Sequence, residues 1–555
     1  MGIPSYYRRL IRTNRGLVQQ SHPGSVDWLW MDFNCLIYHC LRRPDLRPYP
    51  GSEGQEAWEK EFLEAVVTYT KKVVGLVKPA KGVYIAVDGV VPMAKMKQQR
   101  LRRFKSAWLT EHGLAEGQVE GENKPRWDTN SSSHGATKNE APASPSPRVR
   151  ERWDTNAITP GTEFMGKLRK VLEKMNKKWQ ISSSDEPGEG EHKIMEQWRR
   201  CCQATPTERH SQAVSTERCC QATTTTYAVY GLDADLVVLS LLTQDTVSKA
   251  TGQSLSVYLF REEIEEGSMV RDATGEEQFQ WFSIDTLRDI IKETMPIREY
   301  CFAMSFLGND FLPSALGLKM REDGHEVLME LVAHLQRATP LLDEKDRPSV
   351  VGLVALFKSL ASMEEKRVLT YVRNKIRQSD QYAADLTVGD PNWPMVQGEE
   401  NRLLGSGDWR AIYRRSLQGF EGVDGFRTYL QGLGWIWDYY RGVPVCYNWY
   451  YPWSLPPLWS DLGKGLTENP GYVKAVPIVV GAADILTAEQ LCLVLPPSSW
   501  HLIPSVASKQ RRFRTVAPWY FPSEFEFCSI GRRFFWECEP KIPIPSIQEV
   551  KALLS

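Results

Sequence analysis

Seven acidic residues occur in five separate stretches of this 555-residue chain, and each stretch lies beside an apolar run or a Gly/Pro turn. Folded proteins rarely hold so many like charges together unless a cation neutralises them. Ligand sets made only of carboxylate oxygens favour Mg²⁺ or Mn²⁺ over zinc. If the acids converge, we expect a metal-dependent site for phosphoryl transfer. The residues are Asp32, Asp88, Glu189, Glu191, Asp233, Asp235 and Asp310.

A basic run follows Asp88 at residues 95–105, with six cations in eleven positions and no acid. At helical spacing, four of its side chains share one face, which suits a phosphate because arginine forks and an amide add geometry to a lysine charge. These side chains are Lys95, Gln99, Arg102 and Arg103. A solvated basic helix or a nuclear-localisation run is the alternative. The position directly after Asp88 favours a phosphate pocket beside the metals.

Short apolar runs typical of buried strands precede three of the acidic stretches. They span residues 26–31, 83–87 and 227–230, and an amphipathic stretch at 59–76 separates the first two. Strand, crossover helix and strand predict a parallel sheet, and open α/β sheets bind ligands beyond the carboxyl ends of their strands. We therefore expect an α/β fold with a central, mostly parallel sheet flanked by helices. Its rim would carry Asp32, Asp88 and the Asp233/Asp235 pair.

The remaining three acids can reach the same site only if they lie on irregular backbone, such as a loop or a helix start. Asp310 follows a helix-like segment at 300–307 and Gly308-Asn309, so we expect it on a loop. Glu189 and Glu191 are two residues apart, so they can bracket one ion only at an irregular helix start. Any one of these acids could instead be a helix cap or part of a surface turn. Five coincident placements weaken that alternative.

Length and composition predict a large core and a smaller second region. We expect the core at 1–325, with low-complexity insertions at about 113–150 and 201–226. A mainly helical connection follows at 326–420, and a Trp/Tyr/Pro-rich region at 421–555 packs on the core.

Charge balances at 68 basic against 68 acidic residues, which argues against a protein that coats nucleic acid through overall charge. No stretch approaches the ~18 uninterrupted apolar residues of a membrane span. Eleven scattered cysteines do not form a disulfide framework. We expect a soluble monomer without a membrane partner, located in the cytoplasm, with a nuclear location left open.

Five blocks resemble, in this order, the signature blocks of the XRN family of 5′→3′ exoribonucleases: DGVVPMAKMKQQRLRRFK, ITPGTEFM, PGEGEHKIM, GLDADL and FLGNDFLP. The opening MGIPSYY is also similar to that family, as are GVPVCYNWYYPW and LTAEQLCLVLPPSSWHLIP further along. The likeness covers most of the chain except the two insertions. The resemblance implies a short form without the long C-terminal extension of the large cytoplasmic members.

This resemblance implies a core like that of flap-endonuclease and PIN-type nucleases. It implies that the seven acids ligate metal, Mg²⁺ or Mn²⁺, and that Lys95, Gln99, Arg102 and Arg103 bind a 5′-monophosphate. On this interpretation two ions lie roughly 4 Å apart and support hydrolysis. Only the first linkage of single-stranded RNA is cut, so decapped or cleaved transcripts are degraded processively to 5′-mononucleotides. The alternatives are a structure-specific flap endonuclease and a catalytically silent RNA-binding scaffold.

The resemblance also implies two aromatic residues that stack on a base. The family pattern D-M-N-G-I-I-H has a histidine where this chain has Tyr38, with His39 one position late. A tyrosine can still stack, since every base has a π-face. From the second region Trp449 is the candidate, and Trp435, Trp437 and Trp453 compete with it. Another departure is Ser314, where the family usually has a histidine after FLP.

Overall fold

The structure is a computed structural model, which describes residues 3, 5–114, 152–203, 224–265, 268–379, 386–398, 401, 404, 408–415, 417 and 423–555. Most of both predicted insertions lies outside the described residues. At the second one, residues 201–203 still belong to helix α6 (Gly190–Gln203), and strand β5 (Thr225–Tyr230) begins before residue 226. The ends of this predicted insertion therefore fall within regular elements.

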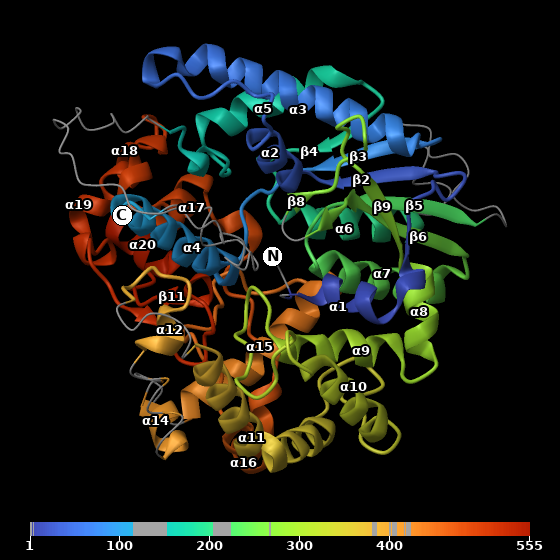
Figure 1. Ribbon diagram of the computed structural model, residues 1–555, viewed down its shortest axis with the longest axis vertical. Coiled ribbons are helices and arrows are strands. Elements are labelled where there is room, and N and C mark those ends of the chain that lie inside the picture. The colour runs from blue at the N-terminus through green and yellow to red at the C-terminus, as the bar shows by residue number, and fades with distance from the viewer. Residues whose placement is uncertain are drawn as a thin grey trace, which may run out of the picture.

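A seven-stranded sheet forms the centre of the fold, in the order β1-β9-β6-β5-β2-β3-β4 (Figure 1). Strands β6, β5, β2, β3 and β4 run parallel, whereas β9 pairs antiparallel with β6 and β1 pairs antiparallel with β9. This confirms the predicted, mostly parallel sheet. The strands are β1 (Val18–Gln19), β2 (Trp28–Asp32), β3 (Gly82–Ala86), β4 (Gln180–Ser182), β6 (Leu255–Glu262) and β9 (Phe279–Ser283), with β5 as given above.

Helices cover both faces of the sheet because successive strand residues point to opposite sides. In β2, Leu29 and Met31 pack toward α2, α3 and α5, whereas Trp30 packs toward α6 and α7. Figure 1 shows α3 and α5 on one side of the sheet and α6 and α7 on the other. These helices are α2 (Phe33–Leu41), α3 (Gln55–Val77), α5 (Glu163–Met175) and α7 (Asp235–Thr251).

The strand positions agree with those predicted for residues 26–31, 83–87 and 227–230, which correspond to β2, β3 and β5. The amphipathic stretch at 59–76 lies within α3. The helix-like segment at 300–307 consists of α9 (Ile297–Ala303) and the 3₁₀ helix η6 (Met304–Leu307). Pattern and length therefore located the elements that carry the acids.

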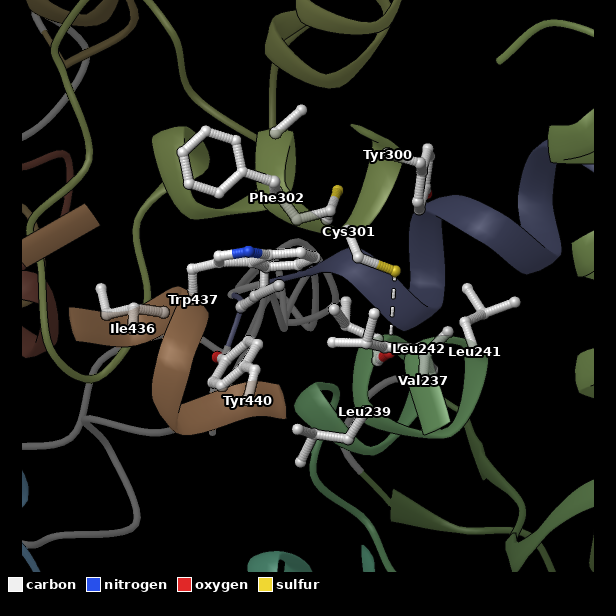
Figure 2. Packing of buried hydrophobic residues seen from close by; sticks show 14 of the residues in the cluster. Val237, Leu239, Leu241, Leu242, Tyr300, Cys301, Phe302, Ile436, Trp437 and Tyr440 are labelled. Atoms are coloured by element: carbon white, nitrogen blue, oxygen red, sulfur yellow. Dashed lines mark hydrogen bonds between the residues drawn. The ribbon is translucent and has the colours of Figure 1, made fainter. Parts of the chain in front are cut away.

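A helical layer packs beneath α7. Figure 2 shows side chains of α9 and α15 (Val423–Arg441) against α7, including Phe302 and Trp437. The rings of these two residues meet edge to face at 5.6 Å. The same hydrophobic cluster contains residues from all three regions predicted from the sequence, so those regions share one core. The boundaries at residues 325 and 420 stay a prediction.

The other helices lie around this core. Beside the sheet are α1 (Tyr6–Thr13) and α8 (Ile284–Lys292), whereas α4 (Met93–Glu111) packs against the last part of the chain. The helical layer adds α10 (Gly324–Leu335), α11 (Val350–Ser379), α12 (Trp393–Val396), α14 (Trp409–Arg415) and α16 (Trp459–Glu468). The last part holds α17 (Thr487–Val494), α18 (Ser508–Arg511), α19 (Phe513–Val516) and α20 (Ile547–Leu554). Two short strand pairs lie outside the central sheet: β7 (Ile264–Glu265) with β8 (Ser268–Met269), and β10 (Phe527–Cys528) with β11 (Glu539–Pro540).

Candidate active site

Three neighbouring parallel strands deliver acids to one rim of the sheet. Asp32 is the last residue of β2 and pairs in register with Ala86 of β3, two residues before Asp88. On the other side, Met31 pairs with the last residue of β5, which leads through a short loop to Asp233. Parallel strands end at the same edge, so the backbone itself brings these carboxylates together.

Asp88 is fixed by hydrogen bonds to both oxygens. Its Oδ1 accepts the backbone N–H of Gly190 at 2.7 Å, and its Oδ2 accepts the amide of Asn34 at 2.7 Å. Asn34 also receives the backbone N–H of Asp88 at 3.2 Å. A Cβ on Gly190 would lie 2.7 Å from Oδ1 of Asp32, so only glycine lets the start of α6 approach both carboxylates this closely.

The start of α6 adds two glutamates and a histidine to the rim. Glu189, Glu191 and His192 each place one ligand atom within 4.8 Å of the other two. Lys193 anchors this turn by donating to the carbonyl oxygens of Val87 and Ser183, both at 2.8 Å. The predicted irregular helix start therefore does bring Glu189 and Glu191 together.

Asp235 and Asp310 complete the acidic rim from other elements. Asp235 opens α7 and is 2% exposed, and its Oδ1 accepts the backbone N–H of Ile3 at 3.0 Å. Asp310 follows η6 on a loop, as predicted. Its Oδ2 lies 2.6 Å from Nζ of Lys95, which also lies 2.5 Å from Oε2 of Glu189. One lysine of α4 thus bridges two acids from different parts of the chain.

Burial raises the pKa values of several of these acids, and the charges of neighbouring acids add to the effect. Burial, followed by the charge of Asp88, raises the pKa of Asp32 well above its usual value. Burial, followed by the charge of Glu189, does the same to the pKa of Glu191. The pKa of Asp235 is raised to about 7 by burial and then by Asp310. Without a cation, part of this rim must therefore hold protons.

A divalent cation fits these residues. The donors are carboxylate oxygens with one neighbouring imidazole, a set that suits Mg²⁺ or Mn²⁺. Oε2 of Glu191 and Nε2 of His192 are buried and have no hydrogen-bond partner among the described residues. Buried polar atoms are costly when they are unsatisfied, and a bound ion would remove the cost.

The basic helix α4 presents the predicted phosphate-binding side chains beside the acids. Gln99 and Arg103 are buried, at 7% and 6% exposed, and Arg102 is half-buried. Oε1 of Gln99 and Nη1 of Arg103 lack a hydrogen-bond partner within the described ranges. Burial lowers the pKa of Arg103 to about 10. With Lys95 already touching Glu189 and Asp310, this face leads directly into the acidic rim.

The other three cations of the basic run serve a structural purpose. Lys97 donates to the carbonyl of Tyr451 at 2.8 Å, and Lys105 donates to the carbonyls of Trp536 and Cys538, both at 2.7 Å. Arg100, 1% exposed, donates to three carbonyls of the second region. One face of α4 therefore binds the helix to carbonyls of the second region, and the other face lies beside the acids.

The predicted stacking residues lie in different surroundings. Tyr38 is half-buried on α2, one turn after Asn34, so both share the face of the helix that meets Asp88. His39 turns away and lies 3.2 Å from Glu277, with its ring 4.5 Å from that of Tyr69. The chain therefore places Tyr38, and not His39, on the side of the site.

Trp449 is 7% exposed and its ring stacks on Trp435 at 4.9 Å. Its contact with a base stays a prediction. Ser314, which replaces the expected histidine, contacts Nζ of Lys319 at 3.2 Å.

Sequence reasoning missed a tyrosine of the second region that touches the site. The hydroxyl of Tyr439 on α15 donates to Oε1 of Glu189 at 2.9 Å, and its ring stacks on His192 at 3.8 Å. Nothing near Tyr439 in the sequence marks it, since its partner is 250 residues away. Sequence reasoning also missed Asn34, which orients Asp88. A local signal could have indicated it, because Asn34 is a polar residue at the start of a helix, two positions after Asp32.

Two family models match the chain. The XRN 5′-3′ exonuclease N-terminus matches residues 1–249, and the Xrn1 helical domain matches residues 417–554. Together these segments span most of the chain, and the first contains six of the seven acids. The chain belongs to the XRN family. The fold therefore combines a PIN-like nuclease domain with the family's helical domain.

Curated relatives agree with this assignment. The chain is 30% identical over 387 residues to 5′-3′ exoribonuclease 2 of Eremothecium gossypii, covering 60% of this chain and 38% of the relative. It is 23% identical to the Gallus gallus 5′-3′ exoribonuclease 2, covering 100% of this chain and 70% of the relative. The human 5′-3′ exoribonuclease 1 is 25% identical, and the chain covers 34% of its length. The chain thus spans well under half of several relatives that it matches.

Within the described ranges, no helix combines the length and apolar character that crossing a membrane requires.

Proposed function

We propose that the protein is a processive 5′→3′ exoribonuclease that degrades 5′-monophosphorylated RNA to 5′-mononucleotides and depends on Mg²⁺ or Mn²⁺. The relatives named above are 5′-3′ exoribonucleases. The observation that carries the proposal is the position of Lys95, which belongs to the phosphate-binding face and lies within 2.6 Å of Glu189 and Asp310. A terminal phosphate on that face would lie next to the acids that hold the metals.

The acidic rim would hold two ions in this proposal. When bound, they supply Lewis-acid stabilisation of the charge that develops as the phosphodiester is hydrolysed. Asn34 and the Gly190 amide orient Asp88, and Tyr439 orients Glu189, so the ligand positions are set before substrate enters. The ligands are Asp32, Asp88, Glu189, Glu191, Asp233, Asp235 and Asp310.

The face of α4 would hold the 5′-phosphate. A buried nitrogen without a hydrogen-bond acceptor is costly, and phosphate oxygens would satisfy Nη1 of Arg103, which has no partner among the residues that the structure describes. The amide of Gln99 and the charges of Lys95 and Arg102 supply further contacts. A 5′-hydroxyl brings no charged oxygens to Nη1 of Arg103, and a cap adds bulk among side chains that are already buried, so both ends should be poor substrates.

A fixed distance between this phosphate and the acids would determine which bond breaks. Because Lys95 contacts both Glu189 and Asp310, a phosphate held on this face would lie close to the acids, and in this proposal only the first linkage reaches the metals. Cleavage then occurs at the first linkage. The shortened strand has a new 5′-phosphate that can enter the same pocket, which accounts for processive release of mononucleotides.

One assay tests the proposal. RNA with a 5′-phosphate, a 5′-hydroxyl or a cap is incubated with the protein, with and without Mg²⁺, and the products are sized. We expect mononucleotides from the 5′-phosphorylated RNA alone, and only when metal is present. An Asp88→Asn variant serves as the matched control and should be inactive. Mixed oligonucleotides would instead indicate a flap-type endonuclease, and binding without cleavage would indicate a scaffold.

A further inference from the structure

A strip of positive charge lies on the last part of the chain, where residues 490–523 contain no Asp or Glu. Its cations lie on α18, on α19 and at Arg512 between the two helices. Figure 1 shows both helices at the edge of the molecule, outside α17 and α20. All four cations are exposed. Together with Trp519 they form what we call the basic strip: Lys509, Arg511, Arg512, Arg514 and Trp519.

Most of this charge is not compensated. Arg514 donates to the carbonyl of Pro497 at 3.1 Å. Within the described part of the chain, the side chains of Lys509, Arg511 and Arg512 form no hydrogen bond or ion pair with another side chain. Some exposed arginines of the protein have acidic partners, as Arg414 has in Asp461 at 2.8 Å. The basic strip is distinguished by its density of charge, since four cations occur within residues 509–514 and no acid lies between residues 490 and 523.

The backbone that carries the cations is firmly held. Phe513 is fully buried between them, and Nε1 of Trp500 donates to the carbonyl of Arg511 at 3.0 Å. Sγ of Cys492 contacts the carbonyl of Gln510 at 3.3 Å. The spacing of the charges is thus set in advance, which reduces the entropy lost when a partner binds.

Trp519 identifies the class of partner. Its side chain is 57% exposed, although large aromatic residues are usually buried. Single-stranded nucleic acid offers a phosphate for each cation and a base for the indole to stack on. The carboxylates of an acidic peptide would pair with the cations but have no π-face to cover the indole, whereas every nucleotide brings a base.

The basic strip also lies near the predicted phosphate pocket. Asp154 is close enough to Arg103 for its negative charge to favour the charged guanidinium. Oδ2 of Asp154 lies 3.9 Å from Nε2 of His501. His501 belongs to the 3₁₀ helix η9 (Pro497–Leu502), whose first residue accepts the bond from Arg514. Exposure rises along this path, from 6% at Arg103 to 62% for the side chain of His501. The path leads from the buried wall of the pocket to the surface.

We propose that the basic strip is a second RNA-contact surface, which holds the single-stranded body of the substrate outside the active site. This inference rests on the proposed function, because it assigns the strip to the same RNA. The cations bind phosphates and Trp519 stacks on one base. The surface binds without sequence preference, since it meets only the backbone and the face of a base.

The test compares the affinities of the protein for two 5′-phosphorylated RNAs, of 30 and 5 nucleotides. Binding is measured by fluorescence anisotropy in EDTA, so the readout does not depend on cleavage. In a Lys509→Ala/Arg511→Ala/Arg512→Ala variant we expect the ratio of the two affinities to fall about tenfold. The slope of log affinity against log salt should become shallower by about 2, from three lost phosphate contacts. The matched control removes three exposed cations on the helical layer: Arg337→Ala/Lys345→Ala/Lys366→Ala.

Two further measurements distinguish RNA from an acidic peptide as the partner of the basic strip. Trp519→Ala should weaken binding of the 30-mer severalfold, and Trp519→Phe should restore it. The inference is overturned if the ratio of affinities stays at the parent value, or if the control variant lowers it equally. It is also overturned if a labelled polyglutamate of equal charge binds as tightly and Trp519→Ala has no effect. A parent protein that binds the 30-mer but cleaves no RNA would refute the proposed function and leave this surface standing.

Discussion

The backbone N–H of Ile3 donates a 3.0 Å hydrogen bond to Oδ1 of Asp235, which lies 232 residues later in the chain. The side chain of Ile3 is 1% exposed, so the donor is held in place by packing. Behind it, α1 is anchored where the hydroxyls of Tyr6 and Tyr300 meet at 2.7 Å. The N-terminal segment therefore orients a carboxylate of the candidate metal site.

Replacing Ile3 by proline should weaken metal binding, because proline has no N–H to give Asp235. We expect the midpoint of the Mg²⁺ dependence of activity to rise about tenfold, the range typical for loss of a group that orients a ligand. Ile3→Val keeps both the donor and the packing and is the control. Equal Mg²⁺ midpoints in the two variants would contradict the assigned role of this hydrogen bond.

Asp235 also predicts how stability depends on pH in the metal-free protein. Burial and then Asp310 raise the pKa of Asp235 to about 7, so from about pH 4 to 7 the folded state binds a proton that the unfolded state has lost. Stability falls with rising pH wherever the folded state binds more protons. We expect the Tm to fall between about pH 4 and 7 and to level off above that, and Asp235→Asn to flatten the fall. A fall in the variant as steep as in the parent would refute the assignment.

Arg103 and Arg100 lie one turn apart on α4, but we expect different effects when each is replaced by alanine: on substrate preference for Arg103 and on stability for Arg100. Arg103→Ala should abolish the preference for a 5′-phosphate over a 5′-hydroxyl while the Tm hardly changes, because Nη1 of Arg103 has no partner within the described ranges. Arg100→Ala should cost about 3 kcal/mol of folding free energy, because it leaves buried carbonyls without their charged donor. Parallel measurement of substrate preference and of urea denaturation checks both. The pocket assignment fails if Arg103→Ala still discriminates between the two RNA ends.

Tyr38 and His39 form a similar pair on α2. Loss of the ring in Tyr38→Ala should weaken binding of RNA by about 1–3 kcal/mol, the usual value for one stacked base. His39→Ala should instead lower stability, since it removes one partner of Glu277 and the ring that packs against Tyr69. Anisotropy with 5′-phosphorylated RNA and thermal melting separate the two effects. If His39→Ala weakens RNA binding more than Tyr38→Ala does, the assignment is reversed.

Tyr439→Phe removes a single hydroxyl from the second region. The ring keeps its stacking on His192, but Glu189 loses the donor at 2.9 Å. We expect the Mn²⁺ affinity, measured by calorimetry, to fall severalfold with little change in Tm. Tyr440→Phe on the same helix is the control, because its hydroxyl has no hydrogen-bond partner among the described residues.

Much of the rim could be predicted from the sequence because its placement is local. Asp32 and Asp88 each follow a short apolar strand, and parallel pairing then brings them to one edge. The break at Gly188-Glu189-Gly190 likewise marked an irregular helix start. These signals extend over fewer than ten residues, so periodicity and turn chemistry were sufficient.

Contacts between distant segments could not be predicted in this way. Lys95 and Asp310 are 215 residues apart, and Tyr439 and Glu189 are 250 apart, so no local pattern marks either pair. The division of the basic run into a fastening face and a pocket face also depends on carbonyls of the second region. Backbone carbonyls are present at every residue, and only the tertiary fold shows which ones Arg100 and Lys105 reach.

The attachment of Arg100 to the carbonyl of Pro543, 443 residues further along, has a consequence for biosynthesis. A ribosome that has made all seven acids has not yet made the groups that seat α4. On the proposed function, the growing polypeptide would be harmless to the message that encodes it. The nuclease would become competent only after Leu493, Tyr520 and Pro543 have emerged from the exit tunnel and their carbonyls have bound Arg100.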